Sequence, residues 1–162
     1  MLTAEVIDLY TKLEAEGIQV WLDGGWAVDA LLGEQTRPHQ DLDIAIQHKD
    51  LAKFKEYLLG QGFKEVTRDE DKMWDLVLQH QDGREIEAHV FSYDGAGVVI
   101  SEDDWNGYTN DSLGGTGTIE GRTVRCVSLN QLVKTHDASK RTLKETDHHD
   151  MAALSKKFGV TF

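Results

Sequence analysis

A chain of 162 residues with 40% hydrophobic side chains is long enough to bury one core, which argues against a disordered segment. Its formal net charge of -12 argues against a nucleic-acid partner, which requires a basic face, and favours a small cationic partner. Negative charge also keeps proteins soluble whatever they bind, so this second argument stays open. A single cysteine, Cys126, excludes an intramolecular disulfide. Without a signal peptide or a membrane-spanning run, we expect a cytoplasmic protein with no membrane partner.

Apolar side chains in the first part of the chain follow helical spacing in some segments and strict alternation in others. These patterns predict, in chain order, a helix capped by Thr3 and ended by Gly17, a strand at 18–22, a short buried helix at 26–32 closed by Gly33, a strand at 41–46 and a helix at 50–59 with Leu59 on its inner face. The strand at 41–46 alternates most clearly, so Asp41 and Asp43 share one face and the apolar residues share the other.

The second part of the chain is rich in strand and turn signals. It predicts strands at 63–67 and 74–80, a hairpin turn at Asp82-Gly83, a return strand at 84–91, a long irregular segment at 93–118, a strand at 123–127, a helix capped by Ser128, and a last helix from about Thr146 to Gly159 that buries Phe158. This order favours an α+β fold, a mixed sheet with helices mostly on one face and extra antiparallel strands. We expect one domain over 1–162, with an insert of hairpins at 93–127 and C-terminal helices at 128–162.

Three carboxylates are the first candidates for chemistry. Asp41 and Asp43 point the same way from one strand, and two like charges that close are unfavourable unless a cation lies between them. Mg²⁺ accepts one or two carboxylates together with phosphate oxygens. Glu87 can join the aspartates if its strand neighbours theirs, as a metal ligand or as the base for an attacking hydroxyl. Glu85 shares its face and is the alternative, and all four acids are also compatible with a solvated strand face.

Gly24 and Gly25 lie between an apolar strand and the start of a helix. Glycines there let a phosphate approach the backbone, and a helix N-terminus offers free N–H groups and the positive end of a dipole. An ordinary turn between a strand and a helix has the same composition, so these glycines alone are weak evidence for a phosphate site.

The order of these features is more specific than any one of them. The run Trp21-Leu22-Asp23-Gly24-Gly25-Trp26, then Arg37-x-His39-x-Asp41-x-Asp43, then an acid at Glu87, resembles the nucleotidyltransferase superfamily of DNA polymerase beta. It is most similar to the small lincosamide nucleotidyltransferases and shares much with the aminoglycoside 2''-nucleotidyltransferases. The similarity is dense over 18–46, returns at 85–90 and 128–154, and is lacking over 93–125, where acceptor specificity would then lie.

This resemblance implies transfer of a nucleoside monophosphate, most simply AMP from ATP, to a hydroxyl of an antibiotic, with release of pyrophosphate. Asp41, Asp43 and Glu87 would be the catalytic residues and would hold two Mg²⁺ ions, while Gly24 and Gly25 would hold the triphosphate of ATP or another nucleoside triphosphate. In-line phosphoryl transfer depends mainly on charge neutralisation and positioning, which agrees with such a site. The sequence has no Walker loop, which argues against a P-loop enzyme.

Arg37, His39 and Lys134 are further candidates for nucleotide binding. Arg37 would contact phosphate and His39 would orient a carboxylate or the loop, while Lys134 matches a position where the superfamily often has a phosphate-binding lysine. Each residue is about as compatible with loop packing or a solvated surface.

Two other groups of residues stay open. Lys140, Arg141 and Lys144 would guide the triphosphate or balance neighbouring acids. Trp105 and Tyr108 would stack on an acceptor ring, although aromatic residues in a long hairpin more often pack locally.

The acceptor has several possible identities. Length and motif detail favour a lincosamide, whereas the acidic charge slightly favours an aminoglycoside. An antitoxin-like minimal nucleotidyltransferase that acts on a protein partner is a further alternative, although the segment at 93–125 argues against it, and a degenerate binding module is the last. Because a short chain has little room for both substrates, we expect a homodimer whose partner subunit completes the acceptor site.

Overall fold

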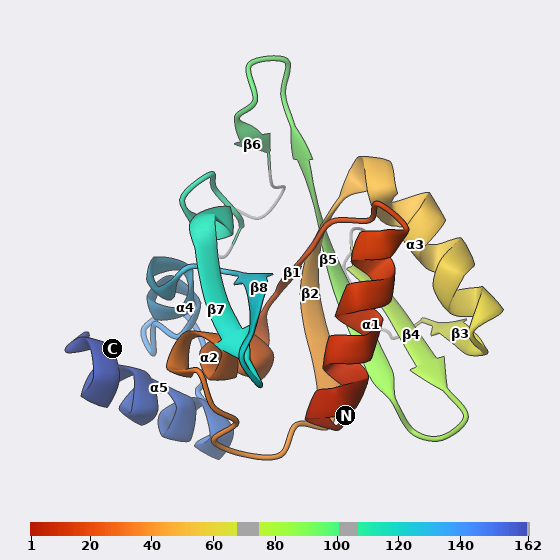
Figure 1. Ribbon diagram of the computed structural model, residues 1–162. Coiled ribbons are helices and arrows are strands. Elements are labelled where there is room, and N and C mark those ends of the chain that lie inside the picture. The colour runs from red at the N-terminus through yellow and green to blue at the C-terminus, as the bar shows by residue number, and fades with distance from the viewer. Residues whose placement is uncertain (68–74, 101–106, 162) are drawn as a thin grey trace.

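The computed structural model describes residues 1–67, 75–100 and 107–161 (Figure 1). Its elements are α1 (Thr3–Ala15), β1 (Val20–Leu22), α2 (Gly24–Leu32), β2 (Asp41–Gln47), α3 (His48–Gly60), β3 (Phe63–Val66), β4 (Asp75–His80), β5 (Glu85–Tyr93), β6 (Val99–Ile100), the 3-10 helix η1 (Ser112–Gly114), β7 (Gly115–Ile119), β8 (Arg122–Cys126), α4 (Leu129–Thr135) and α5 (Glu145–Phe158). Trp74, the predicted first residue of a strand, lies outside the described residues, as does Trp105. Every helix within the described ranges is too short or too polar to cross a membrane.

One mixed sheet organises these elements, with strand order β3-β4-β5-β2-β1-β8-β7 and β6 added to β5. Strand β2 lies at its centre, antiparallel to β1 and parallel to β5, and β1 in turn pairs in parallel with β8. The predicted mixed sheet flanked by helices is therefore confirmed.

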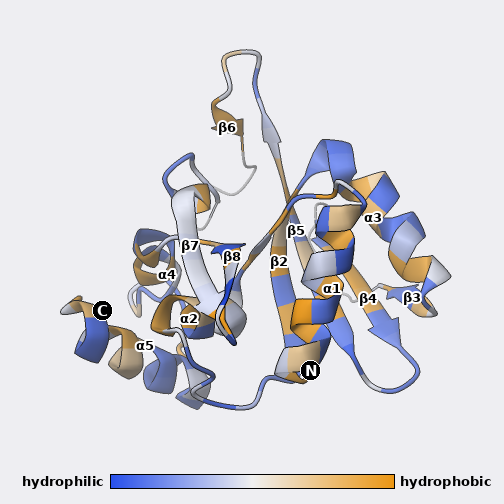
Figure 2. Ribbon diagram, in the orientation of Figure 1, coloured by the Kyte–Doolittle hydropathy of each residue, from blue (hydrophilic) through white to orange (hydrophobic). Residues whose placement is uncertain are grey.

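The alternation of β2 decides which of its faces is buried. Leu42 and Ile44 are buried, and together with Val6 and Tyr10 of α1 they line the same small internal space. Because successive side chains of a strand point to opposite faces, Asp41 and Asp43 project from the face that α1 does not cover. Figure 2 shows hydrophobic residues along the central strands and hydrophilic residues on the outer sides of α3 and α5.

Helices α2, α4 and α5 lie together beside β7 and β8, while α1 and α3 lie over the other half of the sheet (Figure 1). Helix α2 approaches β7 so closely that a Cβ on Gly117 would overlap the carbonyl of Ala30. Only glycine fits at this position of β7, and this close approach fixes α2 against the sheet.

Several predicted details are wrong. Helix α1 begins with Leu2 rather than Thr3 as its N-cap, because the Glu5 carboxylate accepts the N–H of Leu2 at 2.7 Å. Leu59 and Phe158, expected on buried faces, are 44% and 40% exposed. Gly24 and Gly25 do not precede α2 but form its first turn, with Asp23 as the N-cap.

Other predicted ends of helices are confirmed. Ser128 caps α4 by accepting the Gln131 N–H at 3.2 Å, and Gly159 ends α5 in the left-handed conformation. The segment predicted to be irregular at 93–118 contains β6, η1 and most of β7 within its described residues.

Candidate active site

The pairing of β2 with β5 brings the predicted carboxylates together. In the parallel register Asp43 lies beside Glu87, and Asp41 lies beside Glu85. The expectation that the strand of Glu87 neighbours that of the aspartates is therefore confirmed. Since neighbouring residues of paired strands share a face, all four acids project from the same side of the sheet.

The residue that follows β1, Asp23, adds a fifth acid to this surface. The Asp23 N–H donates to the carbonyl of Asp43 at 2.8 Å, which continues the antiparallel pairing of Leu22 with Ile44 by one residue. The side chain of Asp23 thus lies on the same face as Asp43, and the chain turns at once into α2.

Gly24 makes the contact between α2 and the carboxylates possible. It has a φ of 53°, and a Cβ there would overlap Oδ2 of Asp43 and lie 3.1 Å from its Cγ. A positive φ and this close approach both favour glycine. The first turn of α2 therefore lies directly against Asp43.

The environment of Asp43 is unfavourable for an isolated negative charge. Burial raises the pKa of Asp43 to about 7; the nearby His89 opposes this, while the charges of Asp41, Asp23 and Glu87 raise it further. A carboxylate held among three others is typical of a cation site.

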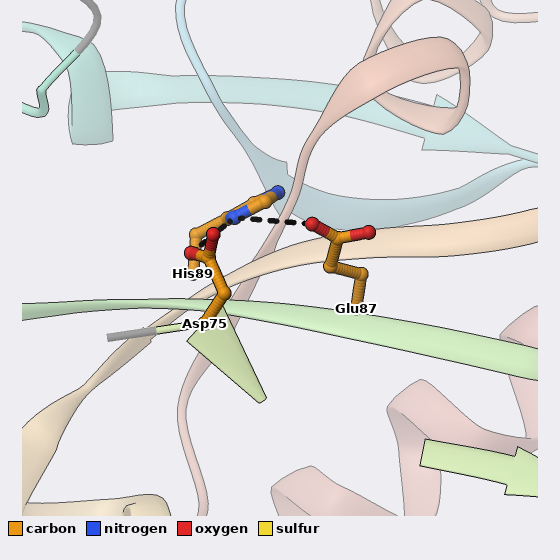
Figure 3. A group of neighbouring side chains, drawn as sticks. All are labelled: Asp75, Glu87 and His89. Carbon is orange, nitrogen blue, oxygen red and sulfur yellow. Dashed lines mark hydrogen bonds and ion pairs between the residues drawn. The ribbon is translucent and has the colours of Figure 1, made fainter. Parts of the chain in front are cut away.

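Strand β4 contributes an acid that the sequence did not single out. Figure 3 shows Asp75 beside His89, with Oδ1 of Asp75 3.0 Å from Nδ1 of His89, and Oε1 of Glu87 4.0 Å from the same nitrogen. Ligand atoms of Asp75, Glu87 and His89 all lie within 4.8 Å of one another, a spacing that would suit a metal ion only with His89 neutral. Only the pairing of β4 with β5, which sets Asp75 opposite His89, reveals this group.

His89 carries a positive charge in this surrounding. Burial by itself lowers its pKa, but the hydrogen bond to Asp75 and the charges of Asp23, Asp43 and Asp75 outweigh burial and raise the pKa to about 9. The imidazolium partly offsets the negative charge of the acids around it.

His39 packs within the loop before β2. Loop packing was one of the two roles that the sequence left open for it. His39 is buried, hydrogen-bonds to Asp29, and packs against Trp26 with ring centroids 4.6 Å apart and the ring planes tilted by 40°. The indole of Trp26 in turn donates to the backbone carbonyl of Asp41 at 3.0 Å. His39 therefore contacts the residue, Trp26, that holds the backbone of Asp41. A Cβ on Gly25 would lie only 2.5 Å from the His39 ring.

Arg37 also lies at the first turn of α2, where its Nη2 would be 2.6 Å from a Cβ on Gly25. Its guanidinium forms a bidentate pair with Asp150 of α5, with Nε–Oδ1 at 2.8 Å and Nη2–Oδ2 at 2.6 Å. Such a planar pair holds the guanidinium in a fixed orientation at the N-terminus of α2. No pattern in the sequence indicates that Asp150, 113 residues away, is the partner of Arg37.

Replacing Asp150 with Ala is expected to lower the free energy of unfolding by about 3 kcal/mol, since it leaves Arg37 without its buried partner. The Asp150 side chain is 4% exposed, so water does not replace the lost contact. Urea unfolding measures the difference. The control is Asp8→Ala, which removes the exposed pair with Lys12 and is expected to cost under about 0.5 kcal/mol. Equal effects of the two substitutions would contradict this description of the Arg37 pair.

Lys134 and Tyr108 lie on the segments that flank the carboxylates. Nζ of Lys134 donates to the carbonyl of Gly107 at 2.9 Å. Tyr108 is buried, its ring centroid lies 6.0 Å from that of Phe91, and its hydroxyl donates to Asp23. Burial, followed by the charge of Asp23, raises the pKa of Tyr108 well above its usual value, so the hydroxyl stays a donor.

Two of the three basic residues predicted to guide the triphosphate or balance acids, Lys140 and Arg141, line an open groove of about 580 Å³. Ser139 and His148 line the same groove. The guanidinium of Arg141 pairs with Asp147 at 3.1 Å and donates to the carbonyl of Thr135. Arg141 thus balances an acid, as one of the two interpretations expects.

Known proteins are similar to this chain in sequence and in fold. The sequence profile of the aminoglycoside-2''-adenylyltransferase family matches residues 5–154. The chain belongs to this family. It is therefore a nucleotidyltransferase, and the predicted enzyme class is confirmed.

Individual relatives of the nucleotidyltransferase fall into two groups. A lincosamide resistance protein of Staphylococcus haemolyticus is 29% identical over 153 residues, which cover 92% of this chain and 89% of that protein. A 2''-aminoglycoside nucleotidyltransferase of Escherichia coli is 34% identical over 56 residues, 33% of this chain and 32% of that protein.

Two solved structures share the fold. The lincosamide antibiotic adenylyltransferase LnuA with bound lincomycin superposes with a TM-score of 0.80 at 24% identity, covering 96% of this chain and 97% of that chain. ANT(2'')-Ia in complex with adenylyl-2''-tobramycin superposes with a TM-score of 0.77 at 18% identity, covering 97% and 89%.

Proposed function

We propose that this nucleotidyltransferase moves AMP from ATP to a hydroxyl of a lincosamide antibiotic and releases pyrophosphate. The observation that carries the proposal is the cluster of Asp41, Asp43 and Glu87 on adjacent strands, directly against the first turn of α2. The lincosamide resistance protein, similar along nearly its whole length, supports this acceptor.

The carboxylates fit a divalent metal. Asp43 has a raised pKa because it is buried among like charges, and a cation at Asp41, Asp43 and Glu87 relieves that repulsion. Mg²⁺ is the ion that suits oxygen ligands and phosphates, and we propose two such ions, as in other two-metal transferases. When bound, Mg²⁺ neutralises charge on the phosphates and makes the attacking hydroxyl more acidic.

The remaining residues act on the donor and on a proton. Gly24 and Gly25 let the triphosphate approach the first turn of α2, Arg37 adds its fixed positive charge there, and Lys134 lies on the neighbouring helix. Glu87 accepts the proton of the acceptor hydroxyl. The oxygen of that hydroxyl forms a bond to the α-phosphorus of ATP, and the bond between the α-phosphorus and the oxygen that bridges it to the β-phosphorus breaks, which releases pyrophosphate. His39 does not touch the donor in this proposal but holds the loop before Asp41.

Metal affinity is expected to rise with pH around neutrality. A proton on Asp43 competes with the metal below its pKa of about 7, so Mg²⁺ should bind about tenfold more weakly at pH 6 than at pH 8. His89, with a pKa of about 9, stays largely charged at both values. Titration calorimetry of the protein with Mg²⁺ measures the ratio. The same affinity at both pH values would contradict the role of Asp43 as a ligand.

An aminoglycoside is the second candidate acceptor, because the matching family profile carries that name and the chain has a net charge of -12. The two are separated by kcat/KM for a panel of lincosamides and aminoglycosides with each nucleoside triphosphate. We expect the highest value for a lincosamide with ATP. A higher value for any aminoglycoside would reverse the assignment.

We also propose that the enzyme is a homodimer and that residues 93–125 form part of the acceptor site. The β5–β6 hairpin projects from the body of the molecule and exposes the apolar side chains of Tyr93, Val98 and Ile100. Exposed apolar side chains gathered on one segment are typical of an interface. Light scattering is expected to give the mass of a dimer. A monomer with full activity would contradict this proposal.

A further inference from the structure

Asp23 is a carboxylate at the catalytic surface with both of its oxygens held by hydrogen bonds. Oδ1 accepts the N–H of Gly24 at 2.8 Å, and Oδ2 accepts the hydroxyl of Tyr108. Its strand position is directly opposite Asp43, and its charge acts on both Asp43 and His89. Asp23 is therefore a fourth acid beside the three assigned to the metals, but it is turned toward donors of the protein itself.

The donor to Asp23 comes from a distant part of the chain. Tyr108 lies 85 residues from Asp23, on the segment between β6 and η1, and its hydroxyl bonds to Asp23. Its ring packs edge-on against Phe91 of β5, which fixes the direction of the hydroxyl. A buried tyrosine with a hydrogen-bonded hydroxyl is a rigid donor.

Contacts on both sides hold Tyr108 in place. The preceding residue, Gly107, accepts Lys134 Nζ of α4 at 2.9 Å. On the other side, Asn110 donates to the carbonyl of Gly97 at 2.9 Å and accepts the N–H of Val99 at 2.8 Å. The segment that carries Tyr108 is thus hydrogen-bonded to α4 and to the β5–β6 hairpin. These bonds fix where the Tyr108 hydroxyl meets Asp23.

We infer that Tyr108 is a positioning residue that keeps the Asp23 carboxylate away from the metal ligands of the transfer reaction. This rests on the proposed function, because it assumes that Asp41, Asp43 and Glu87 hold the metals. Without the hydroxyl, Oδ2 of Asp23 loses a hydrogen bond and becomes available to a cation next to Asp43. A metal would then bind more tightly but in the wrong place, and transfer would slow.

The test compares Tyr108→Phe with the same change at Tyr57, a partly buried residue of α3 outside the catalytic surface. For Tyr108→Phe we expect kcat to fall about tenfold, the size of one hydrogen bond to a charged group. The dissociation constant of Mn²⁺, used as a probe and measured by electron paramagnetic resonance without substrates, is expected to fall about threefold. Tyr57→Phe is expected to change neither.

A double-mutant cycle with Asp23→Asn separates positioning from general damage. If Tyr108 acts through the charge of Asp23, Tyr108→Phe has no further effect on Mn²⁺ binding once Asp23 is Asn. Weaker Mn²⁺ binding in Tyr108→Phe, an unchanged kcat, or an equal effect in both backgrounds would overturn the inference. If the wild type transfers nothing to any acceptor, the proposed function fails, while the Mn²⁺ arm of the cycle still decides the role of Tyr108.

Discussion

Replacing Asp43 with Asn is expected to lower kcat at least about a thousandfold, which corresponds to a loss of about 4 kcal/mol of transition-state stabilisation. Asp43 is the acid that touches most of the site: it lies beside Glu87 in the sheet, opposite Asp23, and against the first turn of α2. Single-turnover kinetics with saturating ATP, Mg²⁺ and acceptor measures the effect. The exposed Asp8 provides the control, since Asp8→Asn should leave kcat unchanged.

The same substitution is expected to stabilise the metal-free protein above pH 7. The pKa of Asp43 is raised in the folded chain from 3.8 to about 7, so the folded state binds a proton more tightly than the unfolded state. Stability therefore falls as pH rises from about 4 to about 7, and an uncharged Asn does not show this loss. A variant that is inactive and also less stable at pH 8 would indicate misfolding rather than a lost ligand.

Replacing Gly24 with Ala is expected to abolish measurable transfer and to destabilise the protein. The new Cβ would overlap the carboxylate of Asp43, and a φ of 53° is strained for alanine by about 1–2 kcal/mol. The first turn of α2 must then move away from β2, which separates the triphosphate site from the carboxylates. Activity and thermal unfolding together measure the two effects.

Gly17→Ala separates backbone strain from the close contact with Asp43. Gly17 has a φ of 73° with nothing within 4 Å of its added Cβ, so this variant has a similar strain without the overlap. We expect it to lose stability but to keep wild-type kcat. Comparable activity of the two alanine variants would show that the contact between Gly24 and Asp43 does not matter for transfer.

The sequence alone predicted the part of the site that depends on local pattern. Alternation along 41–46 placed Asp41 and Asp43 on one face, and β2 confirms it. The choice between Glu85 and Glu87 could not be made locally, because the two share a face and each lies beside one aspartate. The charge of Glu87 raises the pKa of Asp43, and Glu87 lies directly beside Asp43 in the register, so we propose Glu87 as the third acid.

Pairs of residues that lie far apart in the chain were not found from the sequence, although Tyr108 itself was considered as an aromatic ring for stacking or local packing. Asp150 binds Arg37 across 113 residues and Tyr108 binds Asp23 across 85, and no periodicity of the chain signals such pairs. An insert of hairpins was expected at 93–127, but the bounds of β7 within it were not predicted, because Gly115 and Gly117 have no side chains to alternate. Strand β7 forms through pairing with β8 and through the close approach of α2, which are both tertiary effects.

The central claim is that Asp41, Asp43 and Glu87 form a metal-dependent centre for transfer to an antibiotic hydroxyl. It is tested most directly by the mass of a lincosamide after incubation with the protein, ATP and Mg²⁺, with and without a chelator. We expect a gain of one adenylyl group with Mg²⁺, and no gain with the chelator or with Asp43→Asn. An unmodified lincosamide in the presence of Mg²⁺, or the same gain in the presence of the chelator, would contradict the claim.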